Sequence, residues 1–241
     1  MKKSLKRIIN IDAKCVQTKL LNNNGIFLEF DQGNMFHARA MIIGPDKSVY
    51  KHGFLLFDIL FPKDYPFNPP DIVYCPSNKI RIHPNLYTHG GRDGLGKICL
   101  SILGTWHGPK WTSVMDIGDV LLSILSLLDN NPLQHEPGYE KDFTPLHKQY
   151  STIIQNECYY NLFIKNAIKI IKNKDNGFHI FSDIVKEYIS NHKETIMNEI
   201  KKYKSKKISE SRIKMVQLYQ INEYKFSSNN LLNLFEYILS L

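Results

Sequence analysis

Cysteine is scarce in this sequence and widely spaced. The four cysteines among the 241 residues form no CxxC pair and show no metal-ligand spacing; they are Cys15, Cys75, Cys99 and Cys158. The sequence also contains no apolar run that approaches the roughly 18 residues of a membrane span. These absences argue against a disulfide-stapled domain, a metal site and a membrane protein. They favour a reducing intracellular compartment, cytoplasmic or nuclear.

Arginine-rich stripes interleaved with aromatic residues are absent as well, although the chain carries a net charge of +8. A basic balance suits nucleic acid, a membrane surface or acidic protein partners, and the missing stripes disfavour nucleic acid. The basic N-terminus begins like a signal peptide. Asp12, Lys14, Gln17 and Lys19 interrupt any apolar segment there, so we do not expect export.

Hydrophobic residues make up 43% of the chain, enough for one sizeable core. Their spacing predicts an N-terminal helix over 4–21 and a buried core helix over 115–128. Short strand-like runs separated by turn signals predict a four-stranded antiparallel meander, with strands over 26–30, 35–43, 53–61 and 72–75. Further helices are expected over 143–172, 178–202 and 231–239. Because alternating strand and helix units are absent, the fold class is α+β.

The stretch 80–111 carries the residues with chemical potential. It contains the turn His83-Pro84-Asn85, a glycine-rich segment over 88–96 and the cysteine Cys99. A thiol that follows a loop, with an amide side chain upstream, is the layout of a nucleophile beside an oxyanion donor. A proline-rich run over 61–70 precedes this stretch and predicts a stiff, extended loop.

These motifs resemble those of the ubiquitin-conjugating enzymes. His83-Pro84-Asn85 matches the family's HPN motif, and Ile98 to Leu103 matches the segment that bears its active cysteine. The insertion over 104–111 is similar to one in the larger, Z-type members. The likeness covers about 3–172 and implies a ubiquitin-conjugating (UBC) core domain over 1–172. A helical extension packed on that core is expected over 173–241.

The resemblance implies a definite reaction. Cys99 would take ubiquitin, or a related modifier, from the thioester of an activating enzyme and pass it to a substrate lysine or to a ligase. No metal or small cofactor would be bound, and ATP would be consumed upstream by the activating enzyme. An ordinary thiol suffices for exchange between thioesters, so no Cys/His diad is required. The sequence does not specify the modifier, the ligase, the substrates or the chain linkage.

The resemblance also implies roles for residues around Cys99. Asn85 corresponds to the family's oxyanion-stabilising asparagine, or it holds the turn through backbone hydrogen bonds. His83 and Pro84 brace that turn. Glu136 falls where the family places an acidic residue that orients the incoming lysine, with loop hydrogen bonding as its alternative role. Lys97 lies two residues before the cysteine and favours its thiolate or points to solvent.

Partner docking is implied at two further places. Phe67 in the proline-rich loop and Ser113 after Trp111 match the ligase-docking surface. Here Thr112-Ser113-Val114 replaces the family's usual Ser-Pro-Ala. Three basic residues of the N-terminal helix are expected to dock the activating enzyme; they are Lys3, Lys6 and Arg7.

The segment over 88–96 separates Asn85 from Cys99 by more residues than is usual in the family, and we expect a mobile flap that shapes substrate access. Two other functions stay open. One is a cysteine hydrolase that uses Cys99 with His83, His89 or His107 as the base. The other is a non-catalytic binding variant of the same fold. A zinc module is the weakest alternative.

Overall fold

The computed structural model describes residues 2–78, 80–141, 145–173, 176–205 and 231–241. Its strands are β1 (Ile26–Asp31), β2 (Asn34–Ile43), β3 (Phe54–Leu60), β4 (Asp71–Tyr74), β5 (Leu86–Gly90) and β6 (Gly96–Ile98). Its helices are α1 (Lys2–Asn10), α2 (Cys15–Thr18), α3 (Ile117–Leu127), α4 (Pro145–Glu157), α5 (Asn166–Lys172), α6 (Ser182–Ser205) and α7 (Leu231–Leu239). A π-helical stretch, η6 (Cys158–Lys165), joins α4 to α5. Short 3₁₀ turns are η1 (Asp12–Lys14), η2 (Asn22–Asn24), η3 (Arg92–Gly94), η4 (Ser101–Leu103), η5 (Pro132–His135) and η8 (Phe178–Phe181).

The N-terminal helix is shorter than predicted. A continuous helix was expected over 4–21, but α1 ends at Asn10, and η1 and α2 follow as separate turns. The reason is Asp12, which turns into the core and is fully buried. Its carboxylate accepts hydrogen bonds from the Tyr65 hydroxyl at 2.5 Å and from the backbone N–H of Ile117 at 3.0 Å. Burial raises the pKa of Asp12 to about 6.

The sheet contains six strands in the order β1-β2-β3-β4-β6-β5, and every neighbouring pair is antiparallel. The four predicted strands are confirmed, and the α+β class with them. The prediction of only four strands was wrong, because β5 and β6 form a hairpin from the segment expected as a flap. Arg92 in η3 anchors this hairpin through ion pairs to Asp58 on β3 at 2.7 Å and to Asp71 on β4 at 3.0 Å.

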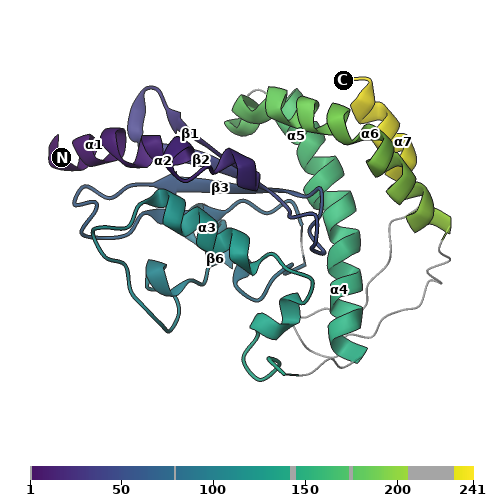
Figure 1. The fold of residues 1–241 in the computed structure, drawn as a ribbon, viewed down its shortest axis with the longest axis horizontal. Helices are drawn as coiled ribbons and strands as arrows, with labels where there is room; N and C mark the ends of the chain where they lie inside the picture. Colours follow the sequence, from purple (N-terminus) through teal and green to yellow (C-terminus); the bar gives the residue numbers. More distant parts are fainter. Residues whose placement is uncertain (1, 79, 142–144, 174–175, 206–230) are drawn as a thin grey trace.

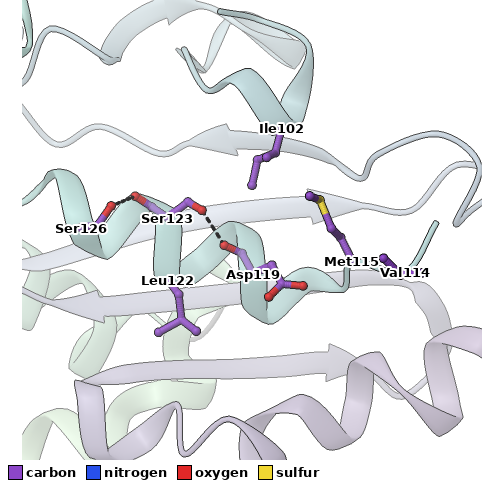
Figure 2. Close-up of a pocket in the computed structure, with 7 residues that line it drawn as sticks. All are labelled: Ile102, Val114, Met115, Asp119, Leu122, Ser123 and Ser126. Carbon is purple, nitrogen blue, oxygen red and sulfur yellow. Dashed lines mark hydrogen bonds between the residues drawn. The ribbon is translucent and has the colours of Figure 1, made fainter. Parts of the chain in front are cut away.

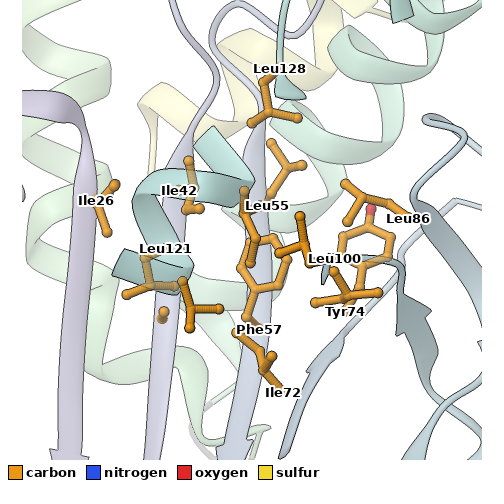
Figure 3. Close-up of a cluster of buried hydrophobic side chains, with 14 of the residues drawn as sticks. Ile26, Ile42, Leu55, Phe57, Ile72, Tyr74, Leu86, Leu100, Leu121 and Leu128 are labelled. Atoms are coloured by element: carbon orange, nitrogen blue, oxygen red, sulfur yellow. The ribbon is translucent and has the colours of Figure 1, made fainter. Parts of the chain in front are cut away.

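One face of the sheet packs against α3 (Figures 1 and 3). Alternate strand residues point to this face and join buried residues of the helix. We call this group the inner cluster: Ala38, Ala40, Ile42, Leu55, Phe57, Ile59, Ile72, Tyr74, Leu86 and Leu100 with Ile117, Val120, Leu121 and Ile124. The core helix was predicted over 115–128. It begins instead at Ile117 because Asp116 caps it, accepting a hydrogen bond from the N–H of Asp119.

The opposite face of the sheet is apolar too, and later helices cover it. We call this group the outer cluster: Met41, Ile43, Phe54, Leu56 and Cys75 with Phe163, Ala167, Ile170, Val185, Ile189, Ile196, Phe235 and Ile238. Since Met41 and Ile43 alternate with Ala40 and Ile42 along β2, neighbouring residues of one strand belong to different clusters. The middle strands are therefore shielded on both sides over part of their length.

The continuous helix from α4 through η6 to α5 links the two clusters. Tyr150 and Ile153 near its start belong to the inner cluster, whereas Phe163 and Ala167 belong to the outer one. At the crossing point, the Cys158 thiol donates to the Tyr50 carbonyl at 3.0 Å. Gly53 permits this approach, because a Cβ there would lie 2.7 Å from the Cys158 sulfur. The first two residues of the helix predicted over 143–172 lie outside the described residues.

Helix α6 packs on the sheet through apolar contacts, and a polar network also joins it to the segment before β3 and to η6. Glu199 accepts hydrogen bonds from Lys51 at 2.7 Å, Tyr159 at 2.7 Å and the buried His52 at 3.1 Å. The hydroxyl of Tyr188 lies 2.7 Å from the other ring nitrogen of His52. Residues 206–230 of the predicted extension lie outside the described part of the chain, and a division at residue 172 stays a prediction. None of the described helices has the length and apolarity that crossing a membrane would require.

Candidate active site

The β5–β6 hairpin brings Asn85 beside Cys99. Leu86 pairs with Ile98 across the two strands, so the residue before β5 faces the residue after β6. Gly96 allows the strands to meet this closely, because a Cβ there would lie 2.0 Å from the Tyr87 carbonyl oxygen. Cys99 is 3% exposed, and the next residue, Leu100, is anchored in the inner cluster (Figure 3). The thiol is therefore carried by a segment tied to the core on one side.

Asn85 contacts the backbone of Cys99 twice. Its carbonyl oxygen accepts from the N–H of Cys99 at 2.9 Å, and its side-chain amide donates to the Cys99 carbonyl at 2.7 Å. The amide thus supports the cysteine segment in this structure, which is the turn-holding alternative given above. An oxyanion role requires the same amide to turn toward the reacting carbonyl, and it stays a prediction.

His83 is enclosed within the turn. Its Nδ1 atom accepts from the N–H of Asn85 at 3.0 Å, and burial lowers its pKa to about 3. The ring is therefore neutral at physiological pH. Pro84, also buried, accepts a hydrogen bond from the guanidinium of Arg81, which stacks 3.5 Å above the centre of the Tyr87 ring. Both residues are thus held within the turn, and their bracing role stays a prediction.

The histidines named for the hydrolase alternative are occupied elsewhere. His83 bonds to backbone, His89 pairs with the adjacent Thr88, and His107 lies beside the ring of Trp106. Within the described ranges, no hydrogen bond joins a histidine to the Cys99 thiol. The geometry gives the hydrolase alternative no support.

Glu136 follows η5 and is half-buried. Its backbone N–H bonds to the Leu133 carbonyl at 3.1 Å, and its carboxylate adds to the raised pKa of Tyr150, which arises mainly from burial. The hydroxyl of Tyr150 in turn donates to the Arg81 carbonyl at 2.8 Å. Glu136 thus lies on the side of the turn that precedes His83. Its role toward an incoming lysine stays a prediction.

Sequence reasoning missed three residues near the site. The His135 ring lies 4.8 Å from that of His83, and it is held by Asp129 at 2.9 Å. Thr105 bonds to the backbone on both sides of Cys99. The contact between His83 and His135 joins distant parts of the chain, and the bonds of Thr105 span five to seven residues through an irregular loop, so no short motif marks either one. The polar side chain of Thr105 directly after Gly104, within the insertion over 104–111, was the one available signal.

The expected docking residues lie on segments that are bonded to one another. The Ser4 hydroxyl of α1 donates to the Lys63 carbonyl at 2.8 Å, and the Trp111 indole donates to the Pro66 carbonyl at 2.7 Å. Phe67 is 79% exposed, and Val114, next to the exposed Ser113, is 82% exposed. The structure therefore joins α1, the proline-rich loop and the segment after Trp111 into one surface.

The three basic residues of α1 differ in their surroundings. Lys3 and Lys6 are exposed. Arg7 is partly buried, and its guanidinium donates to the Met115 carbonyl at 2.7 Å and lies 3.8 Å from the Asp12 carboxylate. Arg7 therefore holds the segment before α3 in place, whereas a docking role for the exposed Lys3 and Lys6 stays a prediction.

Two hollows flank the cysteine segment. One, of about 490 Å³, lies between Ile102 and the face of α3 that carries Asp119, Leu122 and Ser123 (Figure 2). The other, of about 530 Å³, lies between the proline-rich loop and the β5–β6 hairpin and reaches Lys97 and Thr105. No group of three or more metal-ligating side chains occurs within the described residues.

Comparison with known proteins agrees with this geometry. The family model described as Ubiquitin-conjugating enzyme matches residues 5–158, which is more than half of the chain. The chain belongs to the ubiquitin-conjugating enzyme family. It is similar to the Ubiquitin-conjugating enzyme E2 Z of Danio rerio, with 40% identity over 136 residues, or 55% of this chain and 40% of that relative.

Two further relatives extend the comparison. The Putative ubiquitin-conjugating enzyme E2 38 of Arabidopsis thaliana is 35% identical over 185 residues, or 72% of this chain and 52% of that protein. Among solved structures, the E2 domain of a Toxoplasma gondii ubiquitin conjugating enzyme has a TM-score of 0.46 and 26% identity, covering 62% of this chain and 92% of that domain. The chain spans about half or less of the length of these two curated relatives.

Proposed function

We propose that the protein is an acyl carrier that accepts ubiquitin, or a related modifier, as a thioester on Cys99 and passes it on. The observation that carries this proposal is the position of Cys99. Its backbone is bonded to Asn85, and hollows lie on either side of its segment, within a domain that matches the family. The nucleophile and an amide donor are thereby brought together by the β5–β6 hairpin.

The first half-reaction is thioester exchange. The Cys99 thiolate attacks the carbonyl carbon of the modifier's thioester on the activating enzyme, forming a new sulfur–carbon bond. The tetrahedral intermediate then collapses and breaks the bond to the activating enzyme's cysteine, which leaves as a thiolate and takes up a proton. Because one thioester replaces another, the step is close to balanced in free energy. We propose that it uses no metal or bound cofactor, since ATP has been consumed upstream.

The second half-reaction transfers the acyl group to a nucleophile. A neutral lysine amine attacks the Cys99 thioester, its proton leaves, and the Cys99 thiolate is released. A ligase cysteine can attack in the same way. The Asn85 amide would turn from the Cys99 carbonyl to the oxyanion that forms, and Glu136 would orient the lysine. Donors of this kind contribute roughly 3 kcal/mol to transition-state stabilisation.

The partners would meet the surface formed by α1, the proline-rich loop and the segment after Trp111. Lys3 and Lys6 offer exposed positive charge for an acidic surface of the activating enzyme, and Arg7 supports the helix they stand on. Phe67 and Ser113 lie on the linked segments of the same surface and would contact a ligase. The exposed Val114 adds apolar area next to Ser113 where the family usually has proline and alanine.

A charging assay tests the proposal. The protein is incubated with activating enzyme, ATP and ubiquitin and resolved on gels with and without thiol reductant. We expect an adduct one ubiquitin heavier that the reductant removes. Cys99→Ala should form no adduct, and Cys99→Ser should form an ester that resists the reductant. Cys75→Ala, which changes a buried cysteine of the outer cluster, is the matched control and should charge normally.

The same assay with other activating enzymes and ubiquitin-like modifiers decides which modifier is carried. Absence of an adduct with every activating enzyme and modifier would contradict the proposal and favour the non-catalytic binding variant. An adduct that persists in Cys99→Ala would contradict the assignment of the nucleophile.

A further inference from the structure

Cys99 lies between two peptide groups, and each is bonded by the same two residues. In the peptide between Ile98 and Cys99, the Cys99 N–H donates to the Asn85 carbonyl at 2.9 Å. The Ile98 carbonyl of that peptide accepts from the Thr105 hydroxyl at 2.7 Å. Asn85 and Thr105 therefore hold this peptide at its two polar ends.

The peptide after Cys99 repeats the arrangement. Its Cys99 carbonyl accepts from the Asn85 side-chain amide at 2.7 Å, and its Leu100 N–H donates to the Thr105 hydroxyl oxygen at 2.9 Å. A hydroxyl has one donor hydrogen and two acceptor lone pairs, so Thr105 can make both bonds at once. The Leu100 carbonyl, 3.1 Å from the hydroxyl, is the more distant acceptor for the same hydrogen.

The insertion over 104–111 folds back on the cysteine segment. Gly104 adopts a positive φ of 70° after η4, and the backbone N–H of Thr105 donates to the Leu100 carbonyl at 3.2 Å. Further along, a Cβ on Gly108 would lie 3.0 Å from that of Ser101, so the returning chain passes close to the residue two positions after Cys99. The insertion thus has a defined contact with the candidate nucleophile's own backbone.

We propose that Thr105 is a positioning residue for Cys99. Its hydroxyl fixes the two peptide groups whose orientation sets the backbone torsions at Cys99, and these torsions set the direction of the Sγ atom. This inference rests on the proposed function. When the Asn85 amide leaves the Cys99 carbonyl to meet an oxyanion, the two Thr105 bonds remain and keep the cysteine in place. Small displacements of a nucleophile are costly, because attack requires close alignment.

The test compares Thr105→Val, Thr105→Ala and Thr105→Ser. Valine keeps the shape of threonine without the hydroxyl, alanine avoids placing a methyl group at the hydroxyl position, and serine keeps the hydroxyl. The matched control is Thr152→Val on α4, since the Thr152 hydroxyl also donates to a backbone carbonyl at 2.7 Å, far along the chain from Cys99. Each full-length variant is charged in single turnovers over a range of charged activating enzyme.

We expect the maximal rate of transfer to Cys99 to fall about tenfold or more in Thr105→Val and Thr105→Ala. The concentration of activating enzyme that gives half-maximal rate should stay within about twofold, because the docking residues lie on α1. Thr105→Ser should recover most of the rate, and Thr152→Val should match the native protein. A role limited to overall stability would not produce this separation in fully folded protein.

Alkylation by iodoacetamide, followed by peptide mass analysis, provides a readout that needs no activating enzyme. Cys99 should react several-fold faster in Thr105→Val and Thr105→Ala, because loss of the two bonds exposes its thiol. The buried Cys15, Cys75 and Cys158 should remain unreactive and report an intact fold. If the native protein cannot be charged but only the hydroxyl-free variants alkylate faster, the proposed function fails and the positioning role stands.

Native transfer and alkylation rates in Thr105→Val and Thr105→Ala would overturn the positioning role while leaving the proposed function intact. Failure of Thr105→Ser to recover the transfer rate would also overturn it, since the hydroxyl would then not be the acting group.

Discussion

The two faces of the central sheet pack against different helices, and only one of them adjoins the candidate site. The inner cluster packs β2 and β3 against α3 and extends to Leu100, the neighbour of Cys99. The outer cluster packs the same two strands against α5, α6 and α7, and it contains neither Asn85, Cys99 nor Thr105. The family match ends at residue 158, where the long helix passes from one cluster to the other.

The candidate site and the apolar contacts of the outer cluster therefore lie on different faces of one sheet. The residues that hold Cys99 lie at the ends of β5 and β6 and in the loop that follows, all adjoining the inner cluster. The helices on the other face bury Met41, Phe54 and Leu56 and so stabilise the strands; among the described residues, the outer cluster includes none of the groups bonded to the Cys99 backbone. Substitutions on the outer face should therefore change the free energy of unfolding, whereas substitutions beside Cys99 should change the rates of charging and discharge.

The largest expected effect is on the outer face. Phe163→Ala should lower the free energy of unfolding by roughly 3–5 kcal/mol. Phe163 is fully buried, with ring centres of Phe54 at 5.7 Å and Phe235 at 5.9 Å. Urea unfolding measures the loss, and Phe67→Ala, at an exposed position, is the stability control. The charging rate should be unchanged well below the unfolding transition; a rate loss there would break the separation of the two faces.

A second prediction concerns the buried Asp12 and the pH dependence of the free energy of unfolding. Asp12 has a pKa of about 6 in the folded protein against 3.8 for an unperturbed aspartate. Between these two pH values, Asp12 stays protonated in the folded state but is ionised in the unfolded state. The free energy of unfolding therefore falls as pH rises from about 4, and the full loss is reached above about 6. The difference corresponds to roughly 3 kcal/mol.

The variant Asp12→Asn tests whether ionisation of Asp12 lowers the free energy of unfolding as pH rises. The asparagine oxygen can still accept from Tyr65 and Ile117, because both bonds go to the same carboxylate oxygen. Relative to the native protein, the variant should gain roughly 3 kcal/mol in unfolding free energy between pH 4 and pH 7.5. Urea titrations at the two pH values supply the comparison. If the variant and the native protein differed by the same unfolding free energy at both pH values, the pKa of Asp12 would not be raised in the folded protein.

The third prediction addresses reactivity without large changes in the core. Asn85→Ala should slow discharge of the Cys99 thioester to free lysine by roughly 100-fold. Charging should slow as well, by about tenfold, because the bond to the Cys99 carbonyl is lost. Single-turnover charging and discharge assays measure the two steps. Asn24→Ala is the matched control, since its amide also donates to a backbone carbonyl, at 3.2 Å. Equal losses in both steps would leave Asn85 with a purely structural role.

The smallest effect is expected at the polar contact of α6. Burial favours the neutral form of Glu199, but hydrogen bonds from Lys51 and Tyr159 outweigh it and hold the pKa of Glu199 below its usual value. Glu199→Gln should cost about 1 kcal/mol at neutral pH, because the group is partly exposed to solvent. The cost should disappear as pH falls through the pKa values of Glu199. Glu194→Gln, at an exposed position on the same helix, should change the free energy of unfolding by less than Glu199→Gln does.

Much of the inner side could be predicted from the sequence. Runs such as β2 and α3 have a clear period, and the turn signals between strands are strong. The break after α1 could not be predicted, since it depends on Asp12 reaching Tyr65 and Ile117 far along the chain. The β5–β6 hairpin was also hidden, because its glycine-rich sequence lacks the alternation typical of strands, and Arg92 anchors it through distant carboxylates.

The candidate site could be predicted in its parts rather than in its connections. The motif resemblance supplied Cys99, Asn85 and His83. Hydrogen bonds join Asn85 both to His83 in the same turn and to the backbone of Cys99 after β6. The pairing of His135 with His83, and the bonds of Thr105 around Cys99, require the folded backbone.

The double-faced sheet has a consequence for synthesis on the ribosome. The inner face gains its cover when α3 emerges, but the outer face waits for Phe235 in α7, roughly 190 residues after Met41 in β2. At translation rates of roughly 5–20 residues per second, roughly 10–40 seconds separate the synthesis of Met41 from that of Phe235, and the apolar outer face is only partly covered during that time. During that interval the nascent chain exposes apolar side chains of the outer face, while the inner cluster can already pack against α3. We therefore expect newly made molecules to be most prone to misassembly before α7 is made.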